Sequence, residues 1–220
     1  MSVTSKGTLE RNQDEANDER RLHFYAKGEE IPVVTQGVWQ VERGLVQFST
    51  LCPNGEEVLL GWAAPSTFFG LWLFKSLKEF YPSAQSSFYT SYKAISNVYL
   101  KWYSTSEIEA SPSLCQALLP QMGRRIRQTE ALLAINGQRR VEDRLYQLLL
   151  LLKQEVGQTV AEGTRISIRL THQDIANAIN TTRVTVTRLL SNFKRQGLIT
   201  LDSDRHIILK DERFMSVSGL

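Results

Sequence analysis

The sequence predicts an α+β fold in three parts: an N-terminal antiparallel β-roll of the jelly-roll type, a long central helix and a C-terminal winged helix-turn-helix. Three observations lead to this prediction. Short runs of alternating apolar and polar residues fill the first half, an apolar repeat at steps of three and four follows, and a late segment has the pattern of two short helices and a strand. We expect a flexible arm (1–21), the β-roll (22–105), a dimerisation helix (106–137) and the winged domain (138–220).

The arm and the β-roll differ in composition. The arm is polar and rich in charge without a hydrophobic period, so we expect a flexible segment or a frayed helix. From Leu22 to about Tyr103 the pattern becomes that of strands, with turn signals at Arg43-Gly44 and Pro53-Asn54-Gly55. Several short strands at this spacing predict an antiparallel barrel or roll. The alternating runs are 38–51, 56–63 and 86–102.

Residues 106–136 have the pattern of a helix that begins at Ser106 or Ser111. Side chains at steps of three and four form a heptad seam like that of a coiled coil. This seam consists of Leu119, Met122, Ile126, Thr129, Leu133 and Asn136. Because further apolar residues widen the face (Leu118, Leu132 and Ile135), the helix can pack both on its own domain and on a second copy. We expect a homodimer in which Asn136 sets the register; the alternative is that the stripe is plain core.

The C-terminal third contains the signals of a short helix and a tight turn. Thr171 is a favourable N-cap, and Ile175, Ala176 and Ile179 lie along one apolar stripe. Ala176 is small, as the close crossing of two helices requires. Asn180 tolerates the left-handed backbone conformation that a tight turn between helices demands. These features predict the first helix and the turn of a helix-turn-helix.

A second helix follows, and its outer side is suited to contact with DNA. Thr182 can cap it, and its buried side is predicted to consist of Val186, Leu189, Leu190 and Phe193. Its first two turns expose Arg183, Val184, Thr185, Thr187 and Arg188. Arginine can donate two hydrogen bonds to guanine, and threonine or valine methyl groups can pack on the methyl group of thymine. Valine and threonine are poor helix formers, so base contact is a reason for their presence here.

A hairpin after the second helix predicts the wing. Gly197 ends the helical pattern, and the apolar runs 198–201 and 207–209 flank a polar turn. Together with the cap, the turn residue and the small residue, the wing favours binding of double-stranded DNA. Two alternatives stay open: the helices could be ordinary core helices with solvated arginines, or the winged helix could bind another protein.

Composition fits a two-domain regulator inside the cell. The chain has 220 residues, of which 42% are hydrophobic, and a net charge of +3. From Arg139 onward thirteen Lys and Arg face nine Asp and Glu, whereas residues 1–138 hold thirteen against fourteen. The basic character therefore concentrates in the winged part, as phosphate contact favours.

Few residues suggest a metal, a disulfide or catalysis. Cys52 and Cys115 lie far apart without a metal-ligand spacing, and His23, His172 and His206 are scattered. We expect no metal site, and we expect His172 near the DNA backbone or in solvent. There is no signal peptide and no apolar run long enough to span a bilayer, so we expect a cytoplasmic protein without a membrane partner. Because the roll has no recognisable pattern of acids and bases, we expect no enzyme; an enzyme built on the roll is the alternative.

The order of roll, long helix and winged helix resembles the cyclic-AMP receptor and fumarate-nitrate regulator (CRP/FNR) superfamily of bacterial transcription factors. The resemblance covers about residues 22–209 in architecture and is specific in sequence over the C-terminal part. The stretch TTRVTVTRLL (181–190) looks most like the cyanobacterial nitrogen-control (NtcA-like) branch. The resemblance implies a homodimer that places one recognition helix per subunit in successive major grooves. It also implies RNA polymerase as a partner, which the bound regulator would recruit as an activator or, at overlapping promoters, block.

The resemblance assigns DNA contacts by position. It implies that Thr182, Arg183, Thr185 and Arg188 contact DNA and that Thr171 and Gln173 contact phosphates. His172 and Val184 complete the set of candidate DNA-binding residues. Val184 stands where the cyclic-AMP receptor has a glutamate, so the acceptor for cytosine is missing, and the resemblance implies an inverted repeat of GTA and TAC instead.

The sensor half departs from the cyclic-nucleotide pattern of the superfamily. That pattern has a glutamate after a glycine and a later Arg-Ser pair; here Gly70 is followed by Leu71, Trp72 and Leu73, and residues 82–88 contain no arginine. A buried phosphate would lack its charge partner, which argues against cyclic AMP.

The nitrogen-control branch suggests another effector, 2-oxoglutarate. Its sensors use an arginine and a glutamate on the central helix, which Arg125 and Glu130 match by spacing, and an arginine in the roll, where Ser87 stands here. The candidate effector-binding residues are thus Gly70, Leu71, Arg125 and Glu130. Two alternatives stay open. The charged pair could form ion pairs worth little, and aromatic residues could fill the roll (Phe68, Phe69, Trp72, Phe74 and Phe80), leaving control to protein abundance or a co-regulator.

Overall fold

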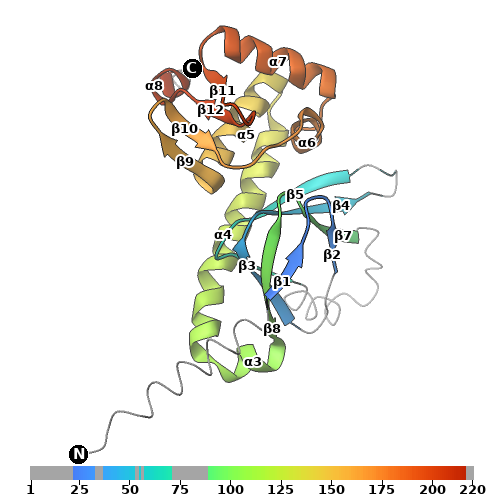
Figure 1. The fold of residues 1–220 in the computed structure, drawn as a ribbon. Coiled ribbons are helices and arrows are strands. Elements are labelled where there is room, and N and C mark those ends of the chain that lie inside the picture. The colour runs from blue at the N-terminus through green and yellow to red at the C-terminus, as the bar shows by residue number, and fades with distance from the viewer. Residues whose placement is uncertain (1–21, 33–36, 53–54, 56, 71–88, 217–220) are drawn as a thin grey trace, which may run out of the picture. The chain divides into compact units, whose positions relative to one another are not determined.

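The computed structural model describes residues 22–32, 37–52, 55, 57–70 and 89–216. Among these residues the chain forms two compact units, of which the first contains 22–46, 63–70 and 92–121 and the second 47–62, 89–91 and 122–216. The elements follow one another as antiparallel strands, a long helical segment and a winged helix-turn-helix, as Figure 1 shows in colour order. The predicted α+β fold class is confirmed.

The first unit contains a four-stranded antiparallel sheet. Its order is β1-β8-β3-β6, formed by β1 (Leu22–Tyr25), β8 (Val98–Ser104), β3 (Gly37–Arg43) and β6 (Phe68–Phe69). In the register of β3 and β8, Trp39 lies opposite Trp102 and Val41 opposite Leu100. In β8 the buried Val98 and Leu100 alternate with half-buried residues, whereas β3 buries Gly37, Val38 and Trp39 in succession and alternates only from Trp39 to Glu42.

A second sheet has the order β2-β7-β4-β5, formed by β2 (Glu30–Ile31), β7 (Tyr89–Ala94), β4 (Val46–Leu51) and β5 (Glu57–Ala63). The predicted turn at Arg43-Gly44 joins β3 to β4, and Gly44 has a φ of 93°. The run 86–102, predicted as one block, contains the two strands β7 and β8. It breaks at 95–97, where Ser96 and Asn97 form a polar turn.

The predicted central helix is divided in two. Helix α3 (Thr105–Ala110) begins at Ser104, whose side chain caps it, so the predicted start at Ser106 is wrong. Helix α4 (Pro112–Gly137) follows Ser111, the other predicted start, which has an extended φ of −119° and ψ of 100°. The physical reason is Pro112, because the ring of a proline disfavours helical dihedral angles in the residue before it.

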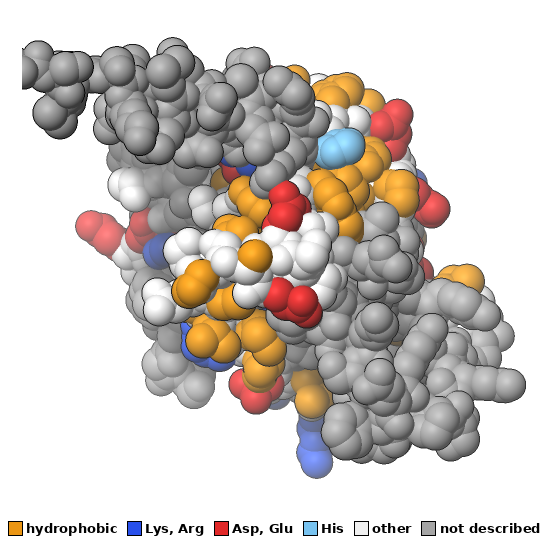
Figure 2. Space-filling view, turned by 90° about the horizontal axis from the view of Figure 1, so that it is seen from below, with side chains coloured by type: hydrophobic (Ala, Val, Ile, Leu, Met, Phe, Trp, Pro, Cys, Tyr) orange, Lys and Arg blue, Asp and Glu red, His pale blue; other side chains and the backbone are white. Residues whose placement is uncertain are grey.

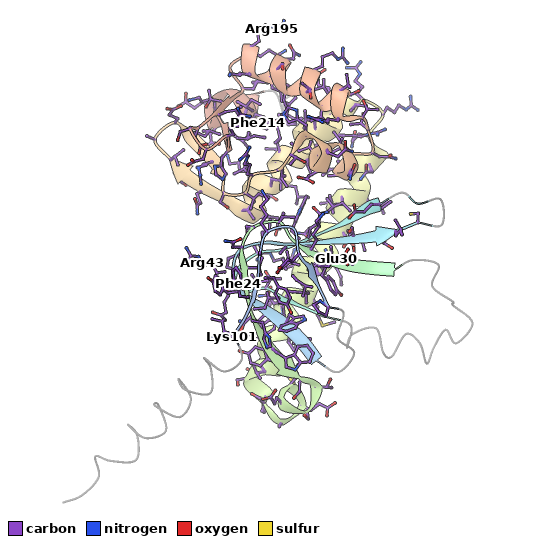
Figure 3. All side chains as sticks on the ribbon, turned by 45° about the vertical axis from the view of Figure 1, so that its right-hand side comes forward. Phe24, Glu30, Arg43, Lys101, Arg195 and Phe214 are labelled. Carbon is purple, nitrogen blue, oxygen red and sulfur yellow. The ribbon has the colours of Figure 1, made fainter. Side chains whose placement is uncertain are left out.

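The C-terminal part has its own core. Helix α5 (Val141–Val156) buries a row of leucines against α7 (Arg183–Arg195) and the strands of a small sheet, with Leu145, Leu148 and Leu149 fully buried. Phe214, on α8 (Asp211–Ser216), points into this core and stacks on Tyr146 at a ring distance of 4.5 Å (Figure 3). The strands of the sheet lie in the order β11 (Ile199–Leu201), β12 (Ile207–Leu209), β10 (Gly163–Ile166) and β9 (Gly157–Val160).

Two strands of that sheet were not predicted. The predicted wing consists of β11 (Ile199–Leu201) and β12 (Ile207–Leu209), and β10 (Gly163–Ile166) pairs with β12, followed by β9 (Gly157–Val160). The wing is therefore anchored to a hairpin that lies before the helix-turn-helix in sequence. The extra pairing fixes the position of the wing beside α6 (His172–Ala178) and α7 (Arg183–Arg195).

Among the residues that the structure describes, no helix is both long and apolar enough to cross a bilayer, and the two cysteines are free thiols. Strand β1 leaves Leu22 and Phe24 exposed. Figure 2 shows one face of the molecule, on which acidic side chains lie among the hydrophobic ones. Such mixing is ordinary for a protein surface, so this face is assigned no partner.

Candidate nucleic-acid interface

Helix α6 begins with the predicted cap. The Thr171 side chain accepts a hydrogen bond from the backbone N–H of Asp174 at 3.1 Å, and the Asp174 carboxylate accepts one from the backbone N–H of Thr171 at 2.7 Å. This capping box satisfies two donors that the start of a helix leaves without partners. Ile175, Ala176 and Ile179 are buried as predicted.

The turn between α6 and α7 also has its predicted geometry. Asn180 has a φ of 50°, in the left-handed region, and the N–H of Thr181 donates to the carbonyl of Ala176 at 3.0 Å. The Thr182 side chain then accepts a hydrogen bond from the N–H of Thr185 at 3.2 Å and caps α7. The local sequence thus sets the angle at which α7 leaves the turn.

Helix α7 separates its buried and exposed sides as predicted. Val186, Leu189, Leu190 and Phe193 are buried, whereas Val184 is 78% exposed. Arg183, Thr187 and Arg188 are exposed and Thr185 is half-buried. An exposed valine next to two arginines is unusual for a solvated surface, and it places a methyl-bearing side chain where a thymine methyl could pack.

The charge of α7 is of one sign. Its four ionisable side chains are the exposed cations Arg183, Arg188, Lys194 and Arg195, and the helix contains no carboxylate. Arg195 lies at the C-terminal end of the helix (Figure 3). A groove of about 710 Å³ runs beside α7, lined by residues of α6, α7 and the wing, including Arg205, and by Arg169, which lies before α6. Concentrated cationic charge beside an exposed helix attracts the phosphates of nucleic acid.

The polar side chains of α6 lie along the same groove. His172 and Thr187 are joined by a hydrogen bond of 2.7 Å between the imidazole Nδ1 and the hydroxyl, which ties α6 to α7. Thr187 also donates to the carbonyl of Arg183 at 2.9 Å. Gln173 is exposed, and its amide donates to Asn177 at 2.7 Å. Of the predicted DNA-binding residues, His172 is thus already occupied in holding the two helices together.

The wing is stiffened by an ion pair that the sequence did not reveal. Nε of Arg165, on β10, donates to Asp202 at 2.7 Å, and its Nη2 lies 2.7 Å from Nδ1 of His206. The hydrogen bond from Arg165 holds the pKa of Asp202 at about 2, well below its ordinary value, with help from the N–H of His206. Arg205, at the wing turn, has a left-handed φ of 63° and an exposed side chain.

One group in the described residues has the composition of a cation site. Asp202, Asp204 and His206 offer ligand atoms within 4.8 Å of one another on the wing. Because Asp202 is already engaged by Arg165, the group is explained by the ion pair that stiffens the wing.

Of the predicted effector residues, the structure describes Arg125, Glu130 and Gly70. The Arg125 guanidinium donates to the carbonyl of Leu60 at 2.7 Å and to the amide oxygen of Gln128 at 3.0 Å, and it lies 4.4 Å above the ring of Phe48. Glu130 is exposed. Gly70 follows β6, and a side chain there would meet the backbone of β3. Leu71, Ser87 and residues 82–88 lie outside the described residues, as do Trp72, Phe74 and Phe80 of the predicted aromatic filling.

Gln128 is a residue that sequence reasoning missed. It is 3% exposed, and its side-chain oxygen accepts from the backbone N–H of Trp62 at 2.9 Å as well as from Arg125. A buried glutamine in an otherwise charged segment (RRIRQTE) is the only sequence signal that could have pointed to it. The network fastens α4 to β5 within the second unit.

Most side chains of the predicted seam of α4 are exposed on the single chain. Leu119, Ile126 and Leu133 are 67%, 57% and 75% exposed, whereas Leu118, Leu132 and Ile135 on the widened face are 3–5% exposed. Met122 and Thr129 are exposed as well. Asn136 differs: its side-chain N–H donates to the carbonyls of Leu132 at 3.0 Å and Ala178 at 3.2 Å.

Comparisons with known proteins agree with this architecture. Residues 143–215 match the Crp-like helix-turn-helix domain family. The chain is 31% identical to the global nitrogen regulator of Synechococcus elongatus over 76% of this chain and 75% of the relative. It is 32% identical to the regulatory protein CysR of the same organism over 82% and 79%. It is 30% identical to the CRP-like cAMP-activated global transcriptional regulator of Mycobacterium tuberculosis over 77% and 74%.

Solved structures show the same fold. FixK2 from Bradyrhizobium japonicum superposes with a TM-score of 0.70 at 21% identity, covering 89% of this chain and 95% of that one. A CRP-family transcriptional regulator from Thermus thermophilus gives a TM-score of 0.69 at 20% identity, covering 90% and 97%. With its DNA-binding helix-turn-helix domain and these relatives, the chain belongs to the CRP/FNR family of transcriptional regulators.

Proposed function

We propose that the chain acts as a homodimer that binds a palindromic promoter site, with one α7 helix in each of two successive major grooves. The observation that carries the proposal is the exposed face of α7, where cationic and methyl-bearing side chains occur without a carboxylate. Helix-turn-helix dimers bind two half-sites one turn of DNA apart, about 34–36 Å. We propose a regulatory rather than a catalytic role, inside the cell.

Individual roles follow from position on α6 and α7. Arg183, Val184, Thr185 and Arg188 would read bases, because they occupy the exposed side of the first two turns. Thr171, Gln173 and Thr182 would contact phosphates from the two helix starts. His172 would act through Thr187, since its ring is hydrogen-bonded there. The proposed half-sites are GTA and TAC.

The α4 seam would form the dimer interface. Three of its apolar side chains are more than half exposed on the single chain, although the neighbouring positions Leu118, Leu132 and Ile135 are buried. Water-exposed leucine and isoleucine in a heptad pattern gain free energy when two helices pair. The proposed segments remain the arm (1–21), the β-roll (22–105), the dimerisation helix (106–137) and the winged domain (138–220); the family match at 143–215 falls within the last.

The effector is a separate part of the proposal. The Mycobacterium tuberculosis relative is named for activation by cAMP, but the sequence pattern of this chain argues against cyclic AMP here. The second candidate is 2-oxoglutarate at Arg125. One guanidinium nitrogen of Arg125 already donates to the Leu60 carbonyl and to Gln128, and Ser87 stands where that kind of site has its second arginine. We therefore propose regulation through protein abundance or a protein co-regulator, and RNA polymerase as the partner at the promoter.

Selection of bound sequences from random duplex DNA, with and without 2-oxoglutarate, tests the whole proposal. We expect enrichment of an inverted repeat and the same repeat with the ligand present. Arg183→Ala with Arg188→Ala is the matched loss-of-binding variant, and Arg139→Ala with Arg140→Ala is the control for charge alone, since both pairs are exposed arginines. Equal, salt-sensitive affinity for every duplex would refute the proposal and favour a protein-binding winged helix. If 2-oxoglutarate changes which repeat is enriched, the ligand acts on this chain, and 2-oxoglutarate replaces protein abundance or a co-regulator in the proposal.

A further inference from the structure

We propose that Asn136 and Arg144 are positioning residues that hold the helix-turn-helix on the end of the central helix and thereby set the half-site spacing that the dimer accepts. Neither residue lies on the DNA-contacting face. The inference rests on the proposed dimeric binding of a palindrome and explains how the recognition helices would be kept at a fixed distance.

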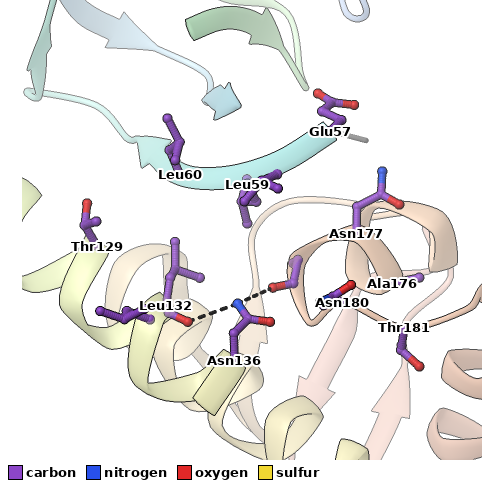
Figure 4. A pocket seen from close by; sticks show the side chains of 13 residues that line it. Glu57, Leu59, Leu60, Thr129, Leu132, Asn136, Ala176, Asn177, Asn180 and Thr181 are labelled. Carbon is purple, nitrogen blue, oxygen red and sulfur yellow. Dashed lines mark hydrogen bonds between the residues drawn. The ribbon is translucent and has the colours of Figure 1, made fainter. Parts of the chain in front are cut away.

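Three consecutive carbonyls at the end of α6 accept hydrogen bonds from these two side chains. Asn136 donates to Ala178 at 3.2 Å, which Figure 4 shows as a dashed line, and Arg144 donates through one guanidinium nitrogen to Ile179 at 3.2 Å and Asn180 at 3.3 Å. The last carbonyls of a helix have no partner within the helix. We call these two side chains and three carbonyls the clamp.

The other ends of the clamp lie on both sides of the break between α4 and α5. Asn136 is in the last turn of α4 and donates also to Leu132 at 3.0 Å. Arg144 is in the first turn of α5, and its Nε donates to the carbonyl of Gln138, within the break, at 2.8 Å. A change of the angle between α4 and α5 would therefore have to break hydrogen bonds to the turn that precedes α7.

Side-chain packing does not fix the end of α6 against α4 and β5, so the hydrogen bonds of the clamp have to do so. A cavity of about 530 Å³ is lined by β5, by α4 and by the end of α6 with its turn, so side chains do not fill the space between these elements (Figure 4). Asn136 lines the cavity, and its side-chain oxygen is buried without a hydrogen-bond partner among the described residues. An amide that donates to two carbonyls but leaves its oxygen unpaired is oriented by those carbonyls.

Fixed orientation matters because half-site spacing is a geometric quantity. One added base pair moves a half-site by about 3.4 Å along the duplex and rotates it by about 35°. A dimer whose recognition helices are rigidly held accepts one spacing, whereas a dimer with a loose attachment accepts several. The clamp thus affects discrimination between spacings and leaves the contact of one helix with one half-site unchanged.

The test measures the dissociation constants of the full chain on three duplexes: the selected palindrome, the same palindrome with one base pair inserted at its centre, and a single half-site. Arg144→Met and Asn136→Asp remove clamp donors at similar side-chain volume. Arg144→Lys keeps the charge without the planar fork. Arg139→Met is the matched control, because Arg139 is an exposed arginine of the same break and is outside the clamp.

We expect Arg144→Met to lower the ratio of affinities for the first two duplexes by about tenfold, the effect typical of losing hydrogen bonds from a charged group. Binding to the single half-site should stay within about twofold of the original chain, which also shows that the winged domain is folded. Asn136→Asp should act in the same direction, Arg144→Lys should be intermediate, and Arg139→Met should leave the ratio unchanged.

Three results separate the outcomes. An unchanged ratio for both clamp variants overturns the inference. Equal weakening on all three duplexes also overturns it, because it would mean a purely structural role. If the original chain binds both palindromes equally, and more tightly than the single half-site, the dimer accepts several spacings and the inference is overturned. If it binds the palindrome no more tightly than the single half-site, the proposed dimeric function fails instead, whatever the variants do. Sedimentation of Asn136→Asp at the same concentration shows whether the seam, rather than the clamp, has been changed.

Discussion

Replacing Leu133 by aspartate is expected to convert the protein into monomers without unfolding it. Leu133 lies in the α4 seam and is 75% exposed on the single chain, while its neighbour Leu132 is 3% exposed. The two leucines are adjacent in sequence and differ in how far their own chain buries them. A substitution at Leu132 therefore tests the stability of the folded chain, and a substitution at Leu133 tests the association of two chains.

The magnitude follows from the exposed fraction. Complete burial of a leucine side chain stabilises by about 1.5–3 kcal/mol, so burying the exposed three quarters of Leu133 contributes about 1–2 kcal/mol per chain. The dimer contains two copies, and its loss amounts to about 2–4 kcal/mol, or about a 30- to 700-fold rise in the dimer dissociation constant. A carboxylate on each helix at the interface weakens association further, because two like charges lose water there.

Sedimentation velocity across a concentration series measures the dissociation constant, and thermal unfolding monitored by circular dichroism measures stability. Leu133→Asp should sediment as a monomer, melt within a few degrees of the original chain at a concentration where both are monomeric, and fail to bind the palindrome. Leu132→Ala should do the opposite, lowering the free energy of unfolding by about 2–5 kcal/mol while the folded protein still dimerises. If the Leu133→Asp variant still sediments as a dimer, the α4 seam does not form the dimer interface.

Three further predictions concern the site and its supports. Arg183→Ala should weaken binding to the selected site by about 1–3 kcal/mol with little change on random DNA, measured by fluorescence anisotropy; equal weakening on both would mean that Arg183 contacts only phosphate. Asp202→Asn should lower the melting temperature at pH 7, because the folded-state pKa of about 2 lies below the ordinary value and the charged form is stabilised by folding. That difference should shrink as the pH falls from about 4 to about 2, and a constant difference in melts at each pH would contradict this origin. Gly61→Ala should destabilise the chain by about 1–3 kcal/mol, since Gly61 has a φ of 136° and a side chain there would meet Gln128 and Arg125; an unchanged melt would show that the network between α4 and β5 can shift.

Features set by short-range rules could be predicted from the sequence. The caps at Thr171 and Thr182 and the left-handed Asn180 depend on residues no more than four positions away, and all three are confirmed. The two sides of α7 follow from its apolar period in the same way. The exposed surface of α7 was therefore predictable before any long-range contact was known.

Features set by long-range pairing could not be predicted. Strands β9 and β10 contain few apolar residues and exist because β10 pairs with β12, which follows more than forty positions later. The partner of Asp202 is Arg165, on that unpredicted strand. The wing was thus predicted as a hairpin, but the ion pair that stiffens it was not.

The polar residues of the central helix show a second reason why contacts in the structure could not be predicted from the sequence. Its polar residues were assigned by side-chain chemistry, Arg125 to a ligand carboxylate and Asn136 to a partner helix. In the structure their acceptors are mostly backbone carbonyls: Leu60 for Arg125, and Leu132 and Ala178 for Asn136. Every residue has a carbonyl, so the sequence carries no signal that a particular one needs a donor. Arg144, which holds two more carbonyls of the helix-turn-helix, received no role at all from the sequence. Polar groups on this helix are therefore best explained first by the carbonyls of loops and strand ends in their own chain, and only then by an effector or a second subunit.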